Sequence, residues 1–217
     1  MEMKKLIAII LIAMVAASGV SAQEQQQEQK SQPGFMAGFA PYYTFINGLR
    51  LDFDFKISDA KNQWLVVSPQ FYYNDESYNW DYEEMSGVGI DLGYRLYLSE
   101  SKRPKGPYFM PGITFQYYAV EDEIFIPVEY TENGNTYFVM EERLENSNLF
   151  KTGPNVLLGY QFLINNILYL DLYGGVAFRM SFDNRDGALQ ENFNYDWFDL
   201  GYQGILLNGG MRVGVAF

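Results

Sequence analysis

The sequence predicts an all-β fold, namely an eight-stranded antiparallel up-and-down transmembrane β-barrel. Three observations predict it: eight segments alternate apolar with polar residues, long and short connections alternate between them, and several polar faces carry charges in mid-strand. The alternation is clearest in residues 49–58 (LRLDFDFKIS), which as a strand have one hydrocarbon face and one charged face. A soluble sheet turns its hydrocarbon face inward, whereas a transmembrane barrel turns it toward lipid.

The N-terminal segment predicts export. Residues 1–22 carry two lysines, an apolar run over residues 6–17 and a Val-Ser-Ala cleavage site, as a secretory signal peptide does. The apolar run is shorter than the about 20 residues that a membrane-spanning helix needs. Residues 23–33 (QEQQQEQKSQP) predict a flexible periplasmic tail, and residues 34–217 predict one barrel domain.

The composition excludes several kinds of function. The chain of 217 residues has no cysteine and no histidine, and its 27 acidic and 15 basic residues give a net charge of −12. Without cysteine it has neither disulfides nor a lipid-modified cysteine, and without histidine it has no Ser-His or Cys-His nucleophile and no histidine metal site. The acidic balance disfavours nucleic acid as a partner. We therefore expect no enzymatic activity, no metal and no cofactor.

The first four predicted strands are residues 34–45, 49–58, 63–73 and 87–98, each supported by a two-residue period. A tight hairpin at residues 46–48 is expected to join the first two. The side chains expected to face outward are Phe35, Phe39, Tyr43 and Phe45 in the first strand, Leu49, Leu51, Phe53, Phe55 and Ile57 in the second, Leu65, Val67, Phe71 and Tyr73 in the third, and Val88, Ile90, Leu92, Tyr94, Leu96 and Leu98 in the fourth.

The last four predicted strands are residues 107–120, 153–164, 167–182 and 204–217. They continue the same period, and the last one ends the chain. The side chains expected to face outward are Phe109, Ile113, Phe115 and Tyr117, then Val156, Leu158, Tyr160 and Phe162, then Leu168, Leu170, Leu172, Val176, Phe178 and Met180, and finally Met211, Val213, Val215 and Phe217.

The lengths of the connections predict the orientation of the barrel. Residues 74–86, 121–152 and 183–203 form the long connections, whereas those after the even-numbered strands are short. Long extracellular loops and short periplasmic turns are typical of outer-membrane barrels, with both termini in the periplasm. Two aromatic girdles are expected at the membrane interfaces. The outer girdle would consist of Tyr42, Tyr43, Tyr72, Tyr73, Tyr117 and Tyr118, and the periplasmic girdle of Phe55, Phe109, Phe162 and Phe217.

The inward faces collect four acids and five bases. They are Arg50, Asp52, Asp54, Lys56, Asp91, Arg95, Asp171, Arg179 and Arg212. The interior of an eight-stranded barrel is just wide enough for side chains to fill it, so these charges are expected to pair and to plug the lumen. An arginine or lysine facing lipid instead would cost about 2–4 kcal/mol near the midplane. The lack of a substrate cleft argues against acid–base catalysis by Asp52 and Asp54.

The long connections are strongly acidic, with eighteen acids and three bases. Glu121, Asp122 and Glu123 are the densest candidate for binding a divalent cation or a basic partner, and a solvated surface that only repels is the alternative. Within residues 121–152, the stretch FIPVEYTENGNTYFVMEE predicts a hairpin around Asn133-Gly134-Asn135. This hairpin is expected to protrude as a ribbon whose exposed edge could recruit a partner strand.

Residues 34–217 resemble the small outer-membrane β-barrel proteins of the OmpA/OmpX type. The resemblance rests on pattern, above all on the alternating last strand that ends in Phe217 and looks like the signal read by the barrel assembly machinery. It implies an eight-stranded antiparallel barrel with a role in envelope integrity, adhesion or host interaction. Barrels that modify lipid A are similar in size, but they rely on histidine, which this chain lacks.

The leading interpretation is a non-enzymatic barrel in the outer membrane of a Gram-negative-type envelope, with lipid as its surroundings and acidic, Tyr-rich loops as its working surface. A secreted lipocalin-like barrel that binds an apolar ligand is the first alternative. It would need Leu49, Phe53, Val88, Leu92, Leu168 and Leu172 inside and Arg50, Asp52, Arg95 and Asp171 in water. A narrow pore is the second alternative, and it depends on a water path through the charges.

Overall fold

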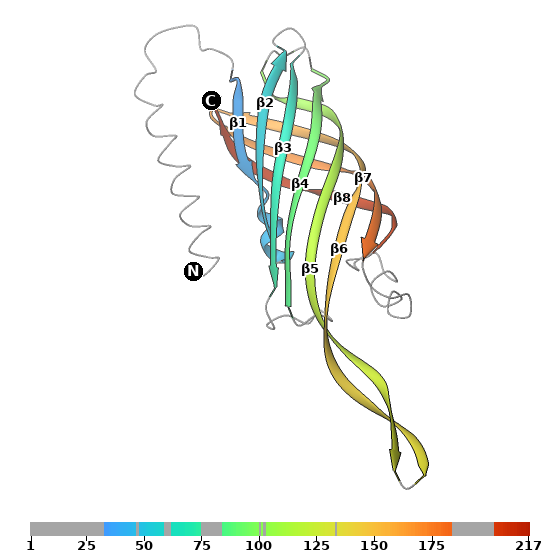
Figure 1. Cartoon of the computed structure of the whole chain (residues 1–217). Helices are drawn as coiled ribbons and strands as arrows, with labels where there is room; N and C mark the ends of the chain where they lie inside the picture. Colours follow the sequence, from blue (N-terminus) through green and yellow to red (C-terminus); the bar gives the residue numbers. More distant parts are fainter. Residues whose placement is uncertain are drawn as a thin grey trace.

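In the computed structural model, eight strands form a closed antiparallel barrel in which each strand pairs with its neighbours in sequence and β1 pairs with β8 (Figure 1). The strands are β1 (Phe35–Phe39), β2 (Gly48–Ser58), β3 (Gln63–Asn74), β4 (Glu84–Tyr97), β5 (Gly106–Glu132), β6 (Asn135–Ile164), β7 (Leu168–Asp183) and β8 (Gly204–Ala216). The structure describes residues 33–46, 48–58, 62–74, 84–99, 101, 103–132, 134–183 and 202–217. The predicted signal peptide and nearly all of the predicted tail lie outside these residues.

The register of the strands puts alternate side chains on the outer wall, as the two-residue period predicts. Val88, Leu158 and Leu172 have exposed fractions of 54%, 60% and 45%. The wall as a whole is apolar, with Phe71, Ile90, Ile113, Val156, Phe162, Leu168, Val176, Phe178, Met211 and Phe217 among its exposed members. Hydrocarbon outside and charge inside is the arrangement of a transmembrane β-barrel.

The first strand is shorter than predicted. β1 ends at Phe39, and Pro41–Ile46 form the 3-10 helix η2 where the sequence predicted more strand and a tight hairpin. Proline has no N–H to give to a strand ladder, so it favours the end of the strand. The hydroxyl of Thr44 then donates to the carbonyl of Pro41 at 2.7 Å and closes the helical turn.

No helix within the described part of the chain combines the length and the apolar character needed to cross a membrane.

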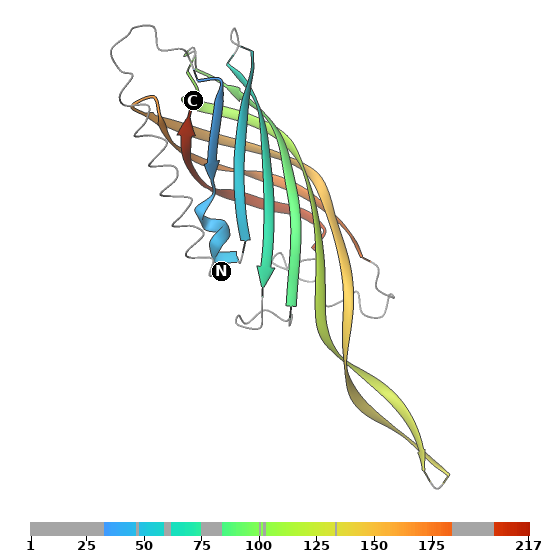
Figure 2. The same ribbon diagram turned by 60° about the vertical axis from the view of Figure 1, so that its left-hand side comes forward.

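One end of the barrel carries the short turns together with the start of β1 and the end of β8 (Figures 1 and 2). Asn165 and Asn166, at φ 52° and 60°, form the predicted tight turn between β6 and β7. At the same end, the amide of Phe217 donates to the carbonyl of Phe35 at 2.8 Å and helps to close the barrel. The parity of the connections is therefore as predicted, although residues 75–83 and 184–201 of the long loops lie outside the described residues.

The longest predicted loop is mostly strand. β5 and β6 pair without a register shift from Gly106↔Gln161 to Glu132↔Asn135, so residues 121–152 continue the sheet. Beyond the end of the barrel they form a twisted two-stranded ribbon (Figure 2). Gly134, at φ 81°, adopts the left-handed conformation that the turn between the two strands requires. The predicted hairpin is confirmed, and the interpretation of residues 121–152 as a loop was wrong.

Two adjacent glycines of β7 test the packing between strands. A Cβ on Gly175 would lie 2.0 Å from the carbonyl oxygen of Val156, whereas one on Gly174 would meet nothing closer than 4.0 Å. We expect Gly175→Ala to destabilise the folded barrel by about 1–3 kcal/mol, because the β6–β7 backbone must move apart. Urea unfolding in detergent micelles measures this effect. Gly174→Ala is the matched control, and equal stability of the two variants would contradict the register.

Candidate functional site: the charged lumen and the external ribbon

Seven charged side chains form one continuous chain of ion pairs inside the barrel. The members, in order of contact, are Asp91, Arg50, Asp52, Arg212, Asp171, Arg95 and Asp54. After the short contact between Asp91 and Arg50, the separations between nitrogen and oxygen are 3.1, 3.4, 3.1, 3.3 and 2.7 Å along the chain. All members except Asp91 are buried. Each arginine contacts two aspartates. This pairing is expected in a narrow lumen, because an unpaired buried charge is far more costly than a paired one.

Four strands supply these charges. β2 contributes Arg50, Asp52 and Asp54, β4 contributes Asp91 and Arg95, and β7 and β8 contribute Asp171 and Arg212. The charges of β2 and β4 recur at every second or fourth residue, so the strand period alone turns them all inward. Asp171 and Arg212 are direct cross-strand partners in the β7–β8 register. The ion-pair chain therefore links both sides of the β1–β8 closure.

Neutral side chains satisfy further hydrogen bonds of the buried charges. The hydroxyl of Tyr108 donates to Asp171 at 2.9 Å and accepts from Arg212 at 2.9 Å. The hydroxyl of Ser68 donates to Asp52 at 2.6 Å. The guanidinium of Arg95 also lies 4.6 Å from the centre of the Tyr108 ring, in the range of a cation–π contact. Apart from its position in the strand period, nothing in the sequence predicted that Tyr108 would bridge Asp171 and Arg212.

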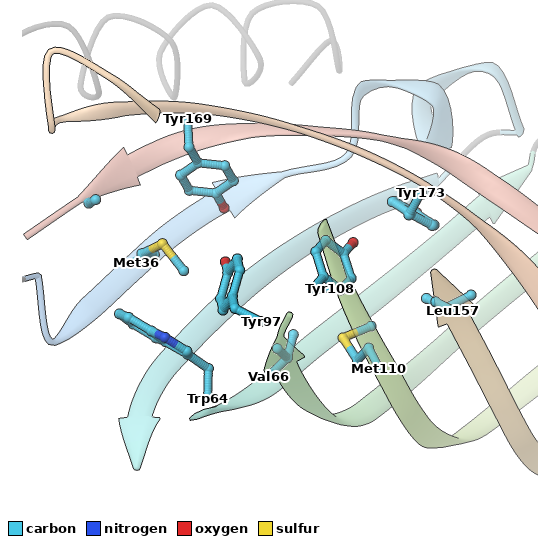
Figure 3. Packing of buried hydrophobic residues seen from close by; sticks show 10 residues of the cluster. Met36, Trp64, Val66, Tyr97, Tyr108, Met110, Leu157, Tyr169 and Tyr173 are labelled. Atoms are coloured by element: carbon cyan, nitrogen blue, oxygen red, sulfur yellow. The ribbon is translucent and has the colours of Figure 1, made fainter. Parts of the chain in front are cut away.

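The short-turn end of the lumen is closed by an apolar layer and by the turn between β4 and β5. Trp64 is fully buried in the packed cluster of Figure 3. Its indole N–H donates to Asn62 at 2.8 Å. The amide of Asn62 in turn donates to the carbonyls of Ser101 and Arg103 at 2.9 and 2.8 Å. Gln161 donates to the carbonyl of Pro104 at 2.8 Å. These bonds hold the turn over the opening.

The loop end of the lumen is closed by tyrosines. The ring of Tyr43 lies 4.7 Å from Tyr42 and 6.0 Å from Tyr72, and Tyr72 lies 5.1 Å from Tyr118. Buried Gln70 and Gln116 join this cluster, since Gln116 donates to both Gln70 and Tyr72. We call Tyr42, Tyr43, Tyr72 and Tyr118 the tyrosine cluster.

The predicted outer girdle was therefore wrong for four of its six members. Consecutive residues of a strand face opposite sides, so only one member of a Tyr-Tyr pair can point toward lipid. Tyr73 and Tyr117 are exposed on the outer wall, whereas Tyr72 and Tyr118 are buried in the lumen. In the first pair, η2 turns Tyr43 inward, where its hydroxyl accepts from Arg50 at 3.3 Å.

Two residues of the predicted charge network lie apart from the ion-pair chain, and one lumen residue was missed. Lys56 is half-buried near the end of β2, and Arg179 is buried on β7 within electrostatic range of Tyr118 and Lys151. Lys151 also faces the lumen, with its ammonium 6.0 Å from the centre of the Tyr118 ring. The loop expected over residues 121–152 includes Lys151, although the inward period of β6 runs back from Asn155 to Leu149 and includes it too.

The predicted cation site was wrong as a loop. Glu121, Asp122 and Glu123 lie in β5 and pair with Asn146, Glu145 and Leu144. Divalent-cation binding by these three residues stays a prediction. Among the described residues, no group of three or more acidic, histidine or cysteine side chains could hold a metal.

The residues that the lipocalin-like alternative needs inside face outward. Val88, Leu168 and Leu172 are exposed on the outer wall, and Leu49, Phe53 and Leu92 are half-buried beside them. Arg50, Asp52, Arg95 and Asp171, which would need water, are the buried members of the ion-pair chain. The pairing also assigns the charges of Asp52 and Asp54 to different arginines.

The external ribbon comprises residues 122–132 and 134–148. Several of its apolar side chains are exposed, with exposed fractions of 67% for Phe138 and 60% for Met140. The hydroxyl of Tyr130 donates to Glu141 across the ribbon, and this bond together with the charge of Glu141 raises the pKa of Tyr130. An isolated two-stranded ribbon is only marginally stable in water.

The C-terminal residue is exposed at the short-turn end. The ring of Phe217 stacks on Phe35 at 5.9 Å, and Phe55 and Phe162 are also exposed outward. Phe109, the fourth member of the predicted periplasmic girdle, is half-buried, and the girdle itself stays a prediction.

Comparison with known proteins found no matching family model and no matching curated protein. Among solved structures, the crystal structure of CarO from Acinetobacter baumannii is similar, with a TM-score of 0.39 and 12% sequence identity. The similarity covers 87% of this chain and 99% of that chain.

Removal of one arginine tests the ion-pair chain. We expect Arg212→Leu to destabilise the barrel by about 3–5 kcal/mol, because Asp52 and Asp171 would lose their shared cation while remaining buried. Urea unfolding in detergent micelles measures the change. Arg103→Leu is the control, because Arg103 is exposed and its guanidinium donates to the side chain of Asn166 at 2.6 Å at the surface; it is expected to change stability by less than about 1 kcal/mol. Similar losses in both variants would contradict a structural role for the chain.

Proposed function

We propose that the protein is a non-enzymatic integral barrel of the outer membrane, with a lumen closed by side chains, and that it works through the surface it exposes beyond the membrane. The observation that carries this proposal is the ion-pair chain beneath an apolar outer wall. Residues outside the barrel, above all the external ribbon, would then make its contacts with partners.

The outer wall supports insertion in lipid. Exposed leucine, valine and phenylalanine side chains surround the barrel, and a folded protein in water rarely exposes so large a continuous apolar surface. If these strands kept their place in the membrane but faced the other way, Arg50 or Arg95 would lie in lipid. Each would then cost about 2–4 kcal/mol near the midplane. The alternating strand pattern supports our proposal that this barrel resembles the OmpA/OmpX type. We propose that the last strand with Phe217 serves as its assembly signal.

The filled lumen argues against a pore. A layer around Trp64, the ion-pair chain and the tyrosine cluster follow one another along the barrel axis. The hydrogen bonds of Asn62 and Gln161 to the β4–β5 turn add a cover at the short-turn end. A water path would have to break these contacts. We therefore assign the barrel to anchoring and presentation, with envelope integrity or surface adhesion as the role.

The available side chains support the proposal of a non-enzymatic role. The chain has no histidine or cysteine, and the inward carboxylates of Asp52, Asp54 and Asp171 are engaged by arginines.

Gel mobility tests the membrane proposal. The chain is extracted from membranes in detergent and run on a denaturing gel with and without boiling. We expect the unboiled protein to migrate differently, because a closed lipid-facing barrel keeps its hydrogen bonds in detergent until it is heated. Solubility as a folded monomer in plain buffer would overturn the proposal.

Conductance in a planar bilayer tests the closed lumen. We expect the reconstituted barrel to give no stepwise currents, because three layers of side chains fill its axis. The inserted fraction is checked on the same preparation by protection of the barrel from added protease. Reproducible current steps from inserted protein would favour the narrow-pore alternative.

A further inference from the structure

We propose that the external ribbon binds an extended basic polypeptide segment as an additional strand along the open edge of β6. This inference rests on the proposed function, because it names the partner of the surface that the barrel would present. Four observations support it: the direction of the backbone groups, the position of one proline, the order of side chains along β6 and the charge of the ribbon.

The backbone direction in β5 can be traced from one hydrogen bond. The amide of Leu98, just after β4, donates to the carbonyl of Pro107 at 2.9 Å, so the backbone groups of Pro107 face β4. Alternate residues of a strand direct these groups to the same side, and β5 keeps one register with β6 from Gly106 to Glu132. Pro127 therefore also directs its backbone to the β4 side. No described strand lies on the β4 side of β5 at Pro127, because the β4–β5 pairing ends at Glu84↔Glu121.

The two edges of the ribbon consequently differ. Pro127 sits on the open edge of β5 and removes a donor from it, which is a common protection of an edge strand. Its partner in the register is Met140, whose N–H and C=O must point away from β5 to the open edge of β6. The pairing of β6 with β7 begins only at Leu149↔Asp183. The even-numbered residues from Thr136 to Asn146 thus form a proline-free edge that no described strand covers.

The side chains along this edge specify the added strand. Phe138, Val139 and Met140 are exposed and apolar, and Glu141 and Glu142 follow them on the two faces of the ribbon. A strand alongside would place apolar side chains next to the first three residues and basic ones next to the two glutamates, because cross-strand neighbours interact in pairs. Recognition would combine backbone hydrogen bonds with alternate side-chain contacts.

The negative charge of the ribbon favours a basic segment as its partner over a second copy of this chain. Residues 122–148 contain seven acidic residues and one arginine. Two such ribbons would repel each other on approach, whereas a lysine- or arginine-rich segment would be attracted and steered toward the edge. A basic extended polypeptide is therefore the partner that fits both the backbone edge and the charge.

Peptide binding to the folded chain in detergent micelles tests the proposal. The probe is a fluorescent ten-residue peptide of alternating valine and lysine, and its matched control replaces each lysine with glutamate. We expect the lysine peptide to bind at least about tenfold more tightly, with an affinity that falls as salt rises. Binding should also slow amide exchange at Phe138 and Met140. Protection of these amides before any peptide is added would overturn the open edge.

Two proline-based variants separate edge binding from general attraction to an acidic protein. Met140→Pro removes an outward N–H from β6 and should weaken binding at least about tenfold. Pro127→Met restores an N–H to the β5 edge and should leave binding unchanged. Equal binding by wild type and Met140→Pro would overturn the proposal, as would a gain of binding in Pro127→Met.

A charge swap keeps the test decisive if Met140→Pro disrupts the ribbon. The double variant Glu141→Lys with Glu142→Lys should lose affinity for the lysine peptide by about threefold to tenfold and gain affinity for the glutamate peptide. Unchanged preference would overturn the proposal. Sedimentation of the wild type identifies the rival occupant, because dimers that Met140→Pro dissociates would assign the edge to a second copy. Heat-dependent gel mobility of the same samples reports on the membrane barrel separately.

Discussion

The alternating chain of aspartates and arginines in the lumen is the interaction on which the rest of the structure depends. A shift of any contributing strand by one residue would carry its charges to the outer wall, because strand side chains alternate with a period of two. β2, β4, β7 and β8 all contribute members, so the register of half the barrel is held by one network. The same network lets the outer wall be purely apolar where lipid would contact it. The network therefore supports both the closure of the barrel and an apolar surface toward lipid.

A lumen filled in this way leaves the function to the outside. The tyrosine cluster and the layer around Trp64 complete the packing at either end of the charges. β5 and β6, in contrast, continue far past the wall and expose phenylalanine, tyrosine and methionine side chains beside glutamates. Rigid pairing at the base of the ribbon and open edges beyond it are what a presented recognition element needs. Under the proposed function, the barrel is the anchor and the ribbon makes the contacts with partners.

The strand pattern, the inward charges and the hairpin at Gly134 were predictable because each follows from a two-residue period or a turn motif. The 3-10 helix was not predictable, because two sequence features oppose each other. The aromatic alternation continues to Phe45 and favours a longer strand, whereas Pro41 favours an end to β1. The Tyr-Tyr pairs misled because enrichment at an interface was given more weight than the opposite directions of neighbouring side chains. Lys151 was missed because a high content of acids suggested a loop, whereas the inward period extended through it. The pairing of particular arginines with particular aspartates needs the three-dimensional register.

Site-directed spin labelling tests the central claim, that the apolar wall faces lipid. The chain has no native cysteine, so single cysteines at Leu172 and Phe178 on the wall and at Phe138 on the ribbon can each carry a nitroxide. In lipid vesicles, the account predicts that oxygen dissolved in lipid relaxes the two wall labels and that a water-soluble nickel complex relaxes the ribbon label. Wall labels as accessible to the nickel complex as the ribbon label would contradict the account.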